Sequence, residues 1–280
     1  MTPLGIIAGL GDLPVQVVEA ARARGQEVYV LRLKGFEEPA LSAYPGQIVG
    51  IAELGKTFKA LRQAGCQQVC FAGIVKRPDF SALKPDLKGM SLLPKAIAAA
   101  RKGDDALLSF MIHSFEAEGF DIIGADEAAG NLKALNGLLA GPQPSEDQLK
   151  DVEKAAKVAL EIGRLDIGQG AIVADGLVLC VEAQEGTDAM LKRCQSLPDE
   201  IRGSETDRKG VLVKRPKPQQ ERRIDLPTIG VATVEAAAAA GLAGIAFETG
   251  GALLVDAEAV KARAEALGVF LYGFAQDWAT

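Results

Sequence analysis

The first half of the chain alternates short apolar runs with longer segments in which apolar residues recur every three or four positions. The runs are typical of buried strands, and the recurring spacing is typical of helices that bury one face. The predicted strands are residues 4–8, 27–33, 47–52, 69–75 and 120–124. The predicted helices are residues 14–24, 54–64, 93–102 and 104–118, with a proline-rich loop over residues 77–94. Alternation of this kind predicts a parallel sheet, so we expect an α/β, Rossmann-like domain over residues 1–136.

The second half has a different pattern. Glycine and proline concentrate over residues 137–145, which predicts a linker, and Ser145 with Gln148 forms a capping box at the start of an amphipathic run. Asp175-Gly176 between two apolar runs predicts a hairpin. The predicted helices are residues 146–164, 188–197, 231–240 and 257–267, and the predicted strands are 171–174, 177–183, 211–214 and 269–274, with a second hairpin of 244–247 and 252–255. We expect a mixed α+β catalytic domain over residues 146–280.

Composition limits the chemistry of any active site. The 280 residues include one histidine, His113, which excludes zinc and two-metal centres that need several imidazoles. A serine or cysteine nucleophile would have to use this one residue as its base. His113 lies off the apolar stripe of its predicted helix, so we expect it to be exposed and not catalytic. The net charge of −6 leaves no basic excess for nucleic acid as the main partner.

The cysteines and the apolar segments indicate a cytoplasmic protein. None of the four cysteines forms a CxxC pair, so we expect reduced thiols in the core. The first residues lack the pattern of a signal peptide, and the longest uncharged apolar stretch is too short to span a bilayer. Any contact with a membrane is therefore expected to be peripheral.

A glycine-rich turn, Gly9-Leu-Gly11-Asp12-Leu13-Pro14, joins the first predicted strand to the first predicted helix. Glycines let the backbone approach a phosphate, and the start of a helix attracts anions. Pro14 stands where the dinucleotide-binding fingerprint has its third glycine, and the second strand ends in Lys34 instead of an acid for the ribose. The turn therefore disfavours NAD, but it leaves open another nucleotide or phosphate site, or a purely structural turn.

A Lys-Arg pair follows an apolar run in each half of the chain. Residues 74–78, Ile-Val-Lys-Arg-Pro, recur as Leu-Val-Lys-Arg-Pro at residues 212–216. If both pairs end buried strands, Lys76-Arg77 and Lys214-Arg215 lie where open α/β sheets bind their ligands, and together they would suit an anionic ligand. The alternative is a coincidence between two basic strand ends.

Three carboxylates lie close together after the first predicted hairpin. Strand alternation places Glu182 on one face with apolar neighbours, where a carboxylate needs a cation or hydrogen-bond donors. Glu182, Glu185 and Asp188 together offer the oxygen ligands that Mg²⁺ prefers. The alternative for Thr187 or Asp188 is a capping role at the next helix.

Asp225 lies in a strongly basic stretch, between the apolar residues Ile224 and Leu226. The apolar neighbours and Pro227 indicate an ordered loop, which makes Asp225 a candidate metal ligand or general base. The alternative is a solvated run of charges with local ion pairs.

Five segments, taken together and in this order, resemble the UDP-2,3-diacylglucosamine pyrophosphatases of the LpxI type, a family of lipid A biosynthesis. They are residues 4–14, 103–108, 168–188, 210–218 and 223–230. The resemblance implies hydrolysis of UDP-2,3-diacylglucosamine to UMP and 2,3-diacylglucosamine 1-phosphate (lipid X), by attack of water on the α-phosphorus with help from Mg²⁺ or another divalent cation. It also implies two domains around a lipid-holding chamber and transient contact with the surface of the inner membrane, and it leaves an oligomer open.

The resemblance also guides the assignment of site residues. Asp225 matches the acid of the family's catalytic step, and we expect Asp188 and Glu182 to act with it. The predicted metal ligands are Asp225, Asp188 and Glu185. The predicted substrate-binding residues are Gly9, Gly11, Asp12, Leu13, Pro14, Lys76, Arg77, Gln169, Thr187, Lys214 and Arg215. Two other classes remain open, a nucleotide or lipid carrier and an NAD(P)-dependent oxidoreductase.

Overall fold

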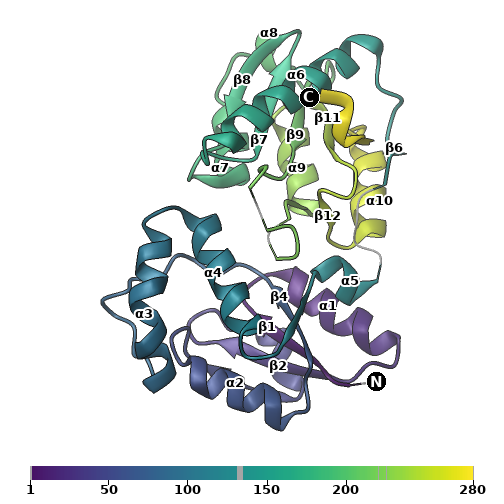
Figure 1. Ribbon diagram of the computed structural model, residues 1–280. Coiled ribbons are helices and arrows are strands. Elements are labelled where there is room, and N and C mark those ends of the chain that lie inside the picture. Colours follow the sequence, from purple (N-terminus) through teal and green to yellow (C-terminus); the bar gives the residue numbers. More distant parts are fainter. Residues whose placement is uncertain (1, 131–134, 220, 225, 280) are drawn as a thin grey trace. The chain divides into compact units, whose positions relative to one another are not determined.

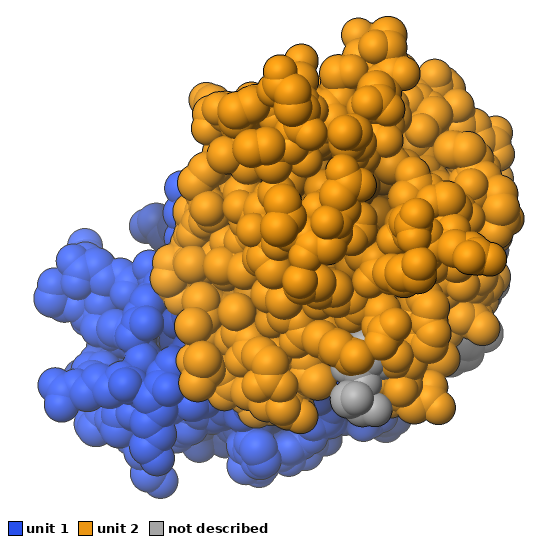
Figure 2. Space-filling view, turned by 90° about the horizontal axis from the view of Figure 1, so that it is seen from above, with its two compact units in different colours: residues 1–131, 221–224 blue, residues 132–220, 225–280 orange. Residues whose placement is uncertain are grey.

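The chain forms two compact units in a computed structural model, which describes residues 2–130, 135–219, 221–224 and 226–279 (Figure 1). Unit 1 consists of residues 1–131 and 221–224, and unit 2 consists of residues 132–220 and 225–280 (Figure 2). A short segment from the second half of the sequence therefore packs with the first half. Asp225, the predicted catalytic acid, lies outside the described residues.

Unit 1 is built on a parallel sheet with strand order β3-β2-β1-β4-β5. The strands are β1 (Leu4–Ala8), β2 (Val28–Leu33), β3 (Gly46–Val49), β4 (Gln68–Ala72) and β5 (Asp121–Ile123). The helices are α1 (Asp12–Ala23), α2 (Leu54–Gln63), α3 (Leu87–Ala100), α4 (Asp104–Glu116) and α5 (Ala125–Ala129), with a 3₁₀ turn, η1 (Pro39–Ala43). Every residue of β1 is buried, as expected for the central strand of a parallel sheet. The predicted parallel sheet is confirmed.

Two elements of unit 1 differ from the prediction. The α3 helix begins at Leu87, inside the predicted proline-rich loop, because the Asp86 carboxylate caps it by accepting the N–H of Gly89 at 2.8 Å. Strand β4 ends at Ala72 instead of residue 75, and Gly73 turns the chain away with a φ of 95°. Lys76 and Arg77 therefore lie in a loop beyond the strand.

The sheet of unit 2 has the strand order β6-β13-β11-β9-β7-β8. Its strands are β6 (Gly137–Ala140), β7 (Gly170–Ala174), β8 (Leu177–Val181), β9 (Lys209–Lys214), β11 (Leu242–Glu248) and β13 (Phe270–Phe274). The helices are α6 (Glu146–Arg164), α7 (Gly186–Cys194), α8 (Asp199–Arg202), α9 (Val231–Ala239) and α10 (Ala257–Leu267), with a 3₁₀ turn, η2 (Gln276–Ala279). Strands β9, β11 and β13 are parallel, and α9 and α10 connect them, so the centre of this unit is α/β instead of α+β.

The two faces of this sheet bury different side chains. Val211 and Val213 of β9 pack with α6, whereas Leu212 packs in a second cluster that includes residues of α7, α9 and α10. Alternation along a strand produces this division. We call the two sides the α6 face and the α9 face.

The predictions for unit 2 are partly confirmed. The hairpin at Asp175-Gly176 is present, with φ of 48° and 75° at the two turn residues, and the Ser145 capping box starts α6. The second hairpin is wrong, because β11 pairs with β9 and β13 while β12 (Leu253–Leu254) pairs in parallel with β10 (Thr228–Ile229). The predicted linker contains β6, a short edge strand that pairs with β13.

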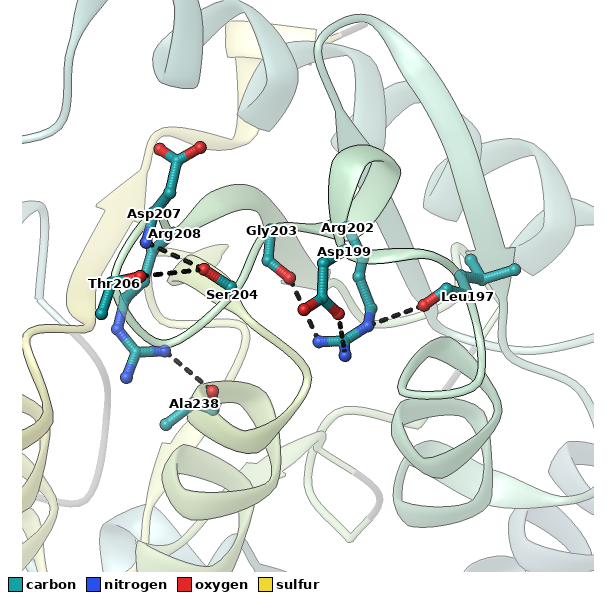
Figure 3. Close-up of polar contacts among 9 residues, drawn as sticks. All are labelled: Leu197, Asp199, Arg202, Gly203, Ser204, Thr206, Asp207, Arg208 and Ala238. Atoms are coloured by element: carbon teal, nitrogen blue, oxygen red, sulfur yellow. Dashed lines mark hydrogen bonds and ion pairs between the residues drawn. The ribbon is translucent and has the colours of Figure 1, made fainter.

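Two arginines between α7 and β9 hold the local backbone through hydrogen bonds. Arg202 donates to the carbonyls of Leu197 and Gly203 and pairs with Asp199, and Arg208 donates to the carbonyl of Ala238 at 2.8 Å (Figure 3). Internal acceptors thus engage both guanidinium groups, which indicates a structural role. None of the described helices is long and apolar enough to cross a membrane.

Candidate active site

The carboxyl ends of β8, β9, β11 and β13 lie at one edge of the second sheet. Lys214 at the end of β9 pairs with Gly170 on one side and with Phe247 on the other, and the N–H of Glu182 donates to the Gly170 carbonyl at 2.8 Å. Glu182, Gly170 and Lys214 therefore occupy one row across three neighbouring strands. Functional groups of open α/β sheets gather at this edge, since the carboxyl ends of parallel strands meet there.

Glu182 follows β8 and is buried, with 6% of its surface exposed. Cys180 packs in the cluster on the α9 face, so alternation directs Glu182 to the same face. Its Oε1 accepts the hydroxyl of Thr187 at 3.1 Å, whereas its Oε2 has no hydrogen-bond partner among the described residues. A buried carboxylate oxygen in this state needs a further ligand, because desolvation without a partner is costly.

Two glycines make room for Glu182, one for its carboxylate and one for its backbone carbonyl. A Cβ atom at Gly170 would lie 2.5 Å from Oε2 of Glu182, and a Cβ atom at Gly168 would lie 2.1 Å from its carbonyl oxygen. Neither glycine has a positive φ, so the space itself, and not the backbone conformation, requires glycine there. The carboxylate thus leans over the backbone of β7 toward the side on which β9 lies.

Lys214 is the cation of this row. It is buried, and alternation from Leu212 places it on the α9 face, as it does Glu182. Its Nζ donates to the carbonyl of Thr228 at 3.1 Å, which ties β10 to the end of β9. The predicted substrate-binding residue therefore also fixes the backbone three positions after Asp225 in the sequence.

Arg215 lies on the opposite, α6 face of the sheet and forms a buried ion pair that the sequence analysis missed. Its Nε lies 2.8 Å from Oε2 of Glu248, and its Nη2 donates to the carbonyl of Gln276 at 3.0 Å. Glu248 is 1% exposed and ends β11. A signal for it was present, because Glu248 is the one charged residue between Glu235 and Asp256. The backbone N–H of Arg215 also donates to the carbonyl of Gln169, another predicted substrate-binding residue.

The other carboxylates of the predicted cluster lie at the start of α7. Glu185 pairs with Arg193 at 2.7 Å, and hydrogen bonds, first to its own backbone N–H and then to Arg193, hold the pKa of Glu185 below its usual value. Asp188 is exposed in the first turn of α7. Within the described part of the chain, no three His, Cys, Asp or Glu side chains are grouped so that they could hold a metal ion.

The glycine-rich turn of unit 1 packs against the loop that follows β4. Gly9 donates its N–H to Ala72, and Leu10 exchanges backbone hydrogen bonds with Ile74. A Cβ atom at Gly9 would lie 2.5 Å from the carbonyl oxygen of Ile74. The close approach of two loops therefore explains the glycine at position 9 without a ligand.

The start of α1 carries the remaining residues of this turn. Gly11 has a φ of 97° and donates its N–H to the Glu38 carboxylate at 3.1 Å, so an acid from another loop already lies at this helix N-terminus. Asp12 is exposed and Leu13 is half-buried, while Pro14 is buried in the first turn of α1, where a proline disturbs no hydrogen bond.

The two Lys-Arg pairs lie in different environments. Lys214 and Arg215 are buried at a strand end, but Lys76 and Arg77 are exposed in a loop. Arg77 pairs with Asp104 at 3.1 Å and also donates to the last turn of α3. The likeness of the two pentapeptides therefore does not extend to their structure.

The cysteines are buried and the histidine is exposed, as the sequence predicts. All four cysteines are free and buried, and burial raises the pKa of Cys70 to about 12 and that of Cys66 to about 11. His113 is exposed, and its Nδ1 lies 2.6 Å from the carbonyl oxygen of Ser109 in its own helix.

The segment that precedes Asp225 is anchored in unit 1. Arg223 donates from Nη1 to Glu116 of α4 at 2.8 Å and binds Glu221 with its Nε and Nη2, each at 3.0 Å. Ile224 packs against the apolar cluster of unit 1. Residues 221–224 therefore belong to unit 1, although the sequence on either side of them belongs to unit 2.

Comparisons with known proteins identify the family. Residues 3–132 match the LpxI N-terminal domain, and residues 135–272 match the LpxI C-terminal domain. The chain is 57% identical over 273 residues to the UDP-2,3-diacylglucosamine pyrophosphatase LpxI of Caulobacter vibrioides, covering 98% of both chains.

Similarity to solved structures is much weaker. A CobK precorrin-6A reductase aligns with 98% of this chain and 88% of its own, at 12% identity and a TM-score of 0.33. The N5-carboxyaminoimidazole ribonucleotide synthetase of Thermotoga maritima aligns with 66% of this chain and 42% of its own, at 15% identity and a TM-score of 0.27. The two domain matches and the full-length relative, and not these folds, establish that the chain belongs to the LpxI family.

Proposed function

We propose that this protein is a UDP-2,3-diacylglucosamine pyrophosphatase, a hydrolase of lipid A biosynthesis. The observation that carries the proposal is the 57% identity to a relative of that name over 98% of both chains. Because that relative is named a pyrophosphatase, it does not support a nucleotide or lipid carrier, nor an NAD(P)-dependent oxidoreductase.

The proposed reaction breaks the diphosphate link of the substrate. A water oxygen attacks the α-phosphorus, the bond from that phosphorus to the bridging oxygen breaks, and the bridging oxygen leaves on the sugar phosphate. The products are UMP, which retains the water oxygen, and 2,3-diacylglucosamine 1-phosphate (lipid X). A general base removes the proton of the attacking water, and nearby cations stabilise the charge that develops on the phosphate oxygens.

The environment of Glu182 supports a divalent metal ion. A buried carboxylate oxygen with no hydrogen-bond partner among the described residues fits a hard cation. We propose that Glu182, Asp188 and Asp225 would hold Mg²⁺, which would neutralise diphosphate charge when bound. Glu185 is less suited to the role that the sequence predicted for it, because its carboxylate is paired with Arg193.

The chain's own residues supply the other parts of the mechanism. We assign Asp225 as the general base, as the family resemblance implies. Lys214 contributes positive charge on the face to which Glu182 points, while its hydrogen bond to the Thr228 carbonyl orders the backbone that follows Asp225. Thr187 holds Glu182 in place through their hydrogen bond at 3.1 Å.

The anionic part of the substrate needs further contacts. We propose that the nucleotide half binds at the carboxyl edge of the unit 1 sheet, because the strand order β3-β2-β1-β4-β5 is the order of Rossmann-like nucleotide-binding sheets. The turn of residues 9–14, with Lys76 and Arg77, lies at that edge. Gln169 and Lys214 are proposed substrate contacts, whereas Arg215 lies on the opposite face of the sheet in its ion pair with Glu248. The two acyl chains require an apolar chamber, and a lipid substrate implies transient contact with the cytoplasmic surface of the inner membrane.

Product analysis tests this proposal. Purified protein with UDP-2,3-diacylglucosamine and Mg²⁺ is expected to release UMP and lipid X in equal amounts, as measured by chromatography. Asp225→Ala is expected to abolish release while substrate binding and thermal unfolding stay close to wild type. Asp207→Ala, which removes an exposed aspartate at the other end of the sheet, is the matched control. Hydrolysis by the Asp225 variant at the wild-type rate would refute the assignment of the base.

A further inference from the structure

The α3 helix exposes two large apolar side chains near its start. Among its fourteen residues only Gly89 and Ala100 are buried. Leu87 is 83% exposed and Met90 is 52% exposed, although α3 also contacts α2 and α4. It lies at the margin of unit 1, beyond α4 (Figure 1). Single exposed apolar residues are ordinary, but two large ones one turn apart on one helix form a surface.

The exposed apolar and basic residues form two adjacent stripes. Leu87, Met90 and Pro94 are spaced by three and four residues, so they follow one side of the helix. Lys88 and Lys95 are spaced by seven residues, which is nearly two full turns, so they form a row beside that side. Lys102 follows in the turn after the helix ends at Ala100. All three lysines are exposed. We call these six residues the α3 surface.

The charge of this surface is opposite to that of the protein. Residues 87–103 contain Lys88, Lys95, Arg101 and Lys102 and no acid, whereas the whole chain carries a net charge of −6. Lys88 pairs with Glu118 of unit 1. Lys95, Arg101 and Lys102 have no ion-pair partner in the described part of the chain. The nearest acids in sequence are engaged elsewhere. Asp86 caps α3, and Asp104 pairs with Arg77.

We propose that the α3 surface docks this protein on an anionic lipid bilayer. A helix that carries apolar side chains beside a row of lysines lies in the plane of such a membrane, with its apolar residues between the headgroups and its lysines at the phosphates. At 1.5 Å per residue, the fourteen residues of α3 would lie along about 21 Å of that surface. The inference rests on the exposure and charge of α3. The lipid substrate of the proposed function would explain why the protein docks on a membrane.

Vesicle binding tests the docking surface directly. The full-length protein is mixed at low salt with vesicles of phosphatidylcholine alone or with one third phosphatidylglycerol, and the bound fraction is measured by flotation. We expect binding only to the anionic vesicles and its loss at high salt. Lys95→Gln/Lys102→Gln is expected to weaken binding about tenfold or more. Leu87→Ser/Met90→Ser is expected to weaken binding at low salt, although it changes no charge.

Matched controls separate this surface from general charge and apolarity. Lys59→Gln/Lys150→Gln removes two exposed lysines from α2 and α6, and Leu177→Ser/Val178→Ser removes two exposed apolar residues from β8. Both are expected to bind vesicles as wild type does. Wild-type binding by the α3 variants, or no binding by the wild type, would overturn the proposal. So would a dimer in solution that the α3 variants abolish, because the surface would then bind a second copy.

Turnover separates this proposal from the proposed function. Both α3 variants are expected to hydrolyse substrate dispersed in neutral detergent at the wild-type rate, because neither removes a residue of the candidate site. Substrate presented in anionic vesicles is expected to be hydrolysed more slowly by the α3 variants. An inactive wild-type protein that still binds anionic vesicles through α3 would refute the function and leave the docking surface intact.

Discussion

Glu182 holds its carboxylate over Gly170, so that a single added Cβ atom at position 170 would lie 2.5 Å from Oε2. The same Oε2 has no hydrogen-bond partner among the described residues, and Glu182 is 6% exposed. A protein seldom keeps a buried carboxylate oxygen in this state unless a ligand completes it. The contact between Glu182 and Gly170 is therefore the structural basis of the candidate site.

The first prediction concerns the gap at Gly170. Gly170→Ala is expected to displace the Glu182 carboxylate and lower kcat at least about tenfold, while overpacking lowers the free energy of unfolding by about 1–3 kcal/mol. Gly230→Ala is the control, because a Cβ atom there meets nothing within 4 Å. Urea unfolding and steady-state kinetics on both variants check the prediction, and full activity in Gly170→Ala would show that the gap has no role.

The second prediction separates a catalytic Glu182 from a structural one. Glu182→Gln retains the shape and the acceptor for Thr187 but removes the charge, so we expect kcat to fall about 100-fold or more. We expect the melting temperature to stay equal or rise, because the variant no longer buries a charge. Glu185→Gln removes an exposed carboxylate and is expected to change kcat only slightly. A large loss of stability in Glu182→Gln with normal kcat would assign the residue to the fold.

The third prediction concerns the buried ion pair of Arg215 and Glu248. Glu248→Gln removes the carboxylate charge from a buried ion pair with Arg215, so we expect the free energy of unfolding to fall by about 3 kcal/mol. The control is Glu235→Gln, which breaks an exposed pair with Arg263 and is expected to cost at most about 1 kcal/mol. Equal effects of the two substitutions in urea unfolding would contradict this role for the pair.

The fourth prediction concerns the anchor that precedes Asp225. Arg223→Gln breaks the contacts with Glu116 and Glu221, and we expect kcat to fall several-fold because the segment is released from unit 1. These pairs are partly exposed, so we expect the free energy of unfolding to change by less than about 1 kcal/mol. Arg263→Gln breaks a similarly exposed pair and is expected to leave kcat unchanged.

The ionisation of Glu221 sets the pH range in which its contact with Arg223 acts. Hydrogen bonds from Arg223 hold the pKa of Glu221 below its usual value of 4.5. A lowered pKa stabilises the folded state above the usual pKa and loses that effect as the pH falls through the lowered value. The effect of Arg223→Gln on kcat is therefore expected to be constant at neutral pH and to disappear only in acid, where Glu221 is protonated in both proteins.

Local patterns predicted those parts of the fold that local physics decides. The buried run of β1 and the hairpin at Asp175-Gly176 are in place, because burial and turn chemistry are encoded in adjacent residues. The second hairpin failed for the opposite reason. The apolar runs of β11 and β12 are close in sequence, but each finds a parallel partner elsewhere in the chain. Strand pairing over long sequence separations leaves no mark in a local pattern.

The candidate site was predictable to a similar extent. Alternation along β8 identified Glu182 as a buried carboxylate, and the structure adds the glycine gap that makes room for it. Glu248 was missed because its partner, Arg215, lies on a different strand. The Lys-Arg repeat was misleading at Lys76, since Gly73 ends β4 before the pair is reached.

Isotope transfer tests the central claim most directly. Purified protein is incubated with UDP-2,3-diacylglucosamine and Mg²⁺ in ¹⁸O-labelled water, and the products are examined by phosphorus NMR. Attack of water on the α-phosphorus predicts an isotope-shifted signal in UMP and an unlabelled sugar phosphate. Label in the sugar phosphate, or no release of UMP, would contradict the account.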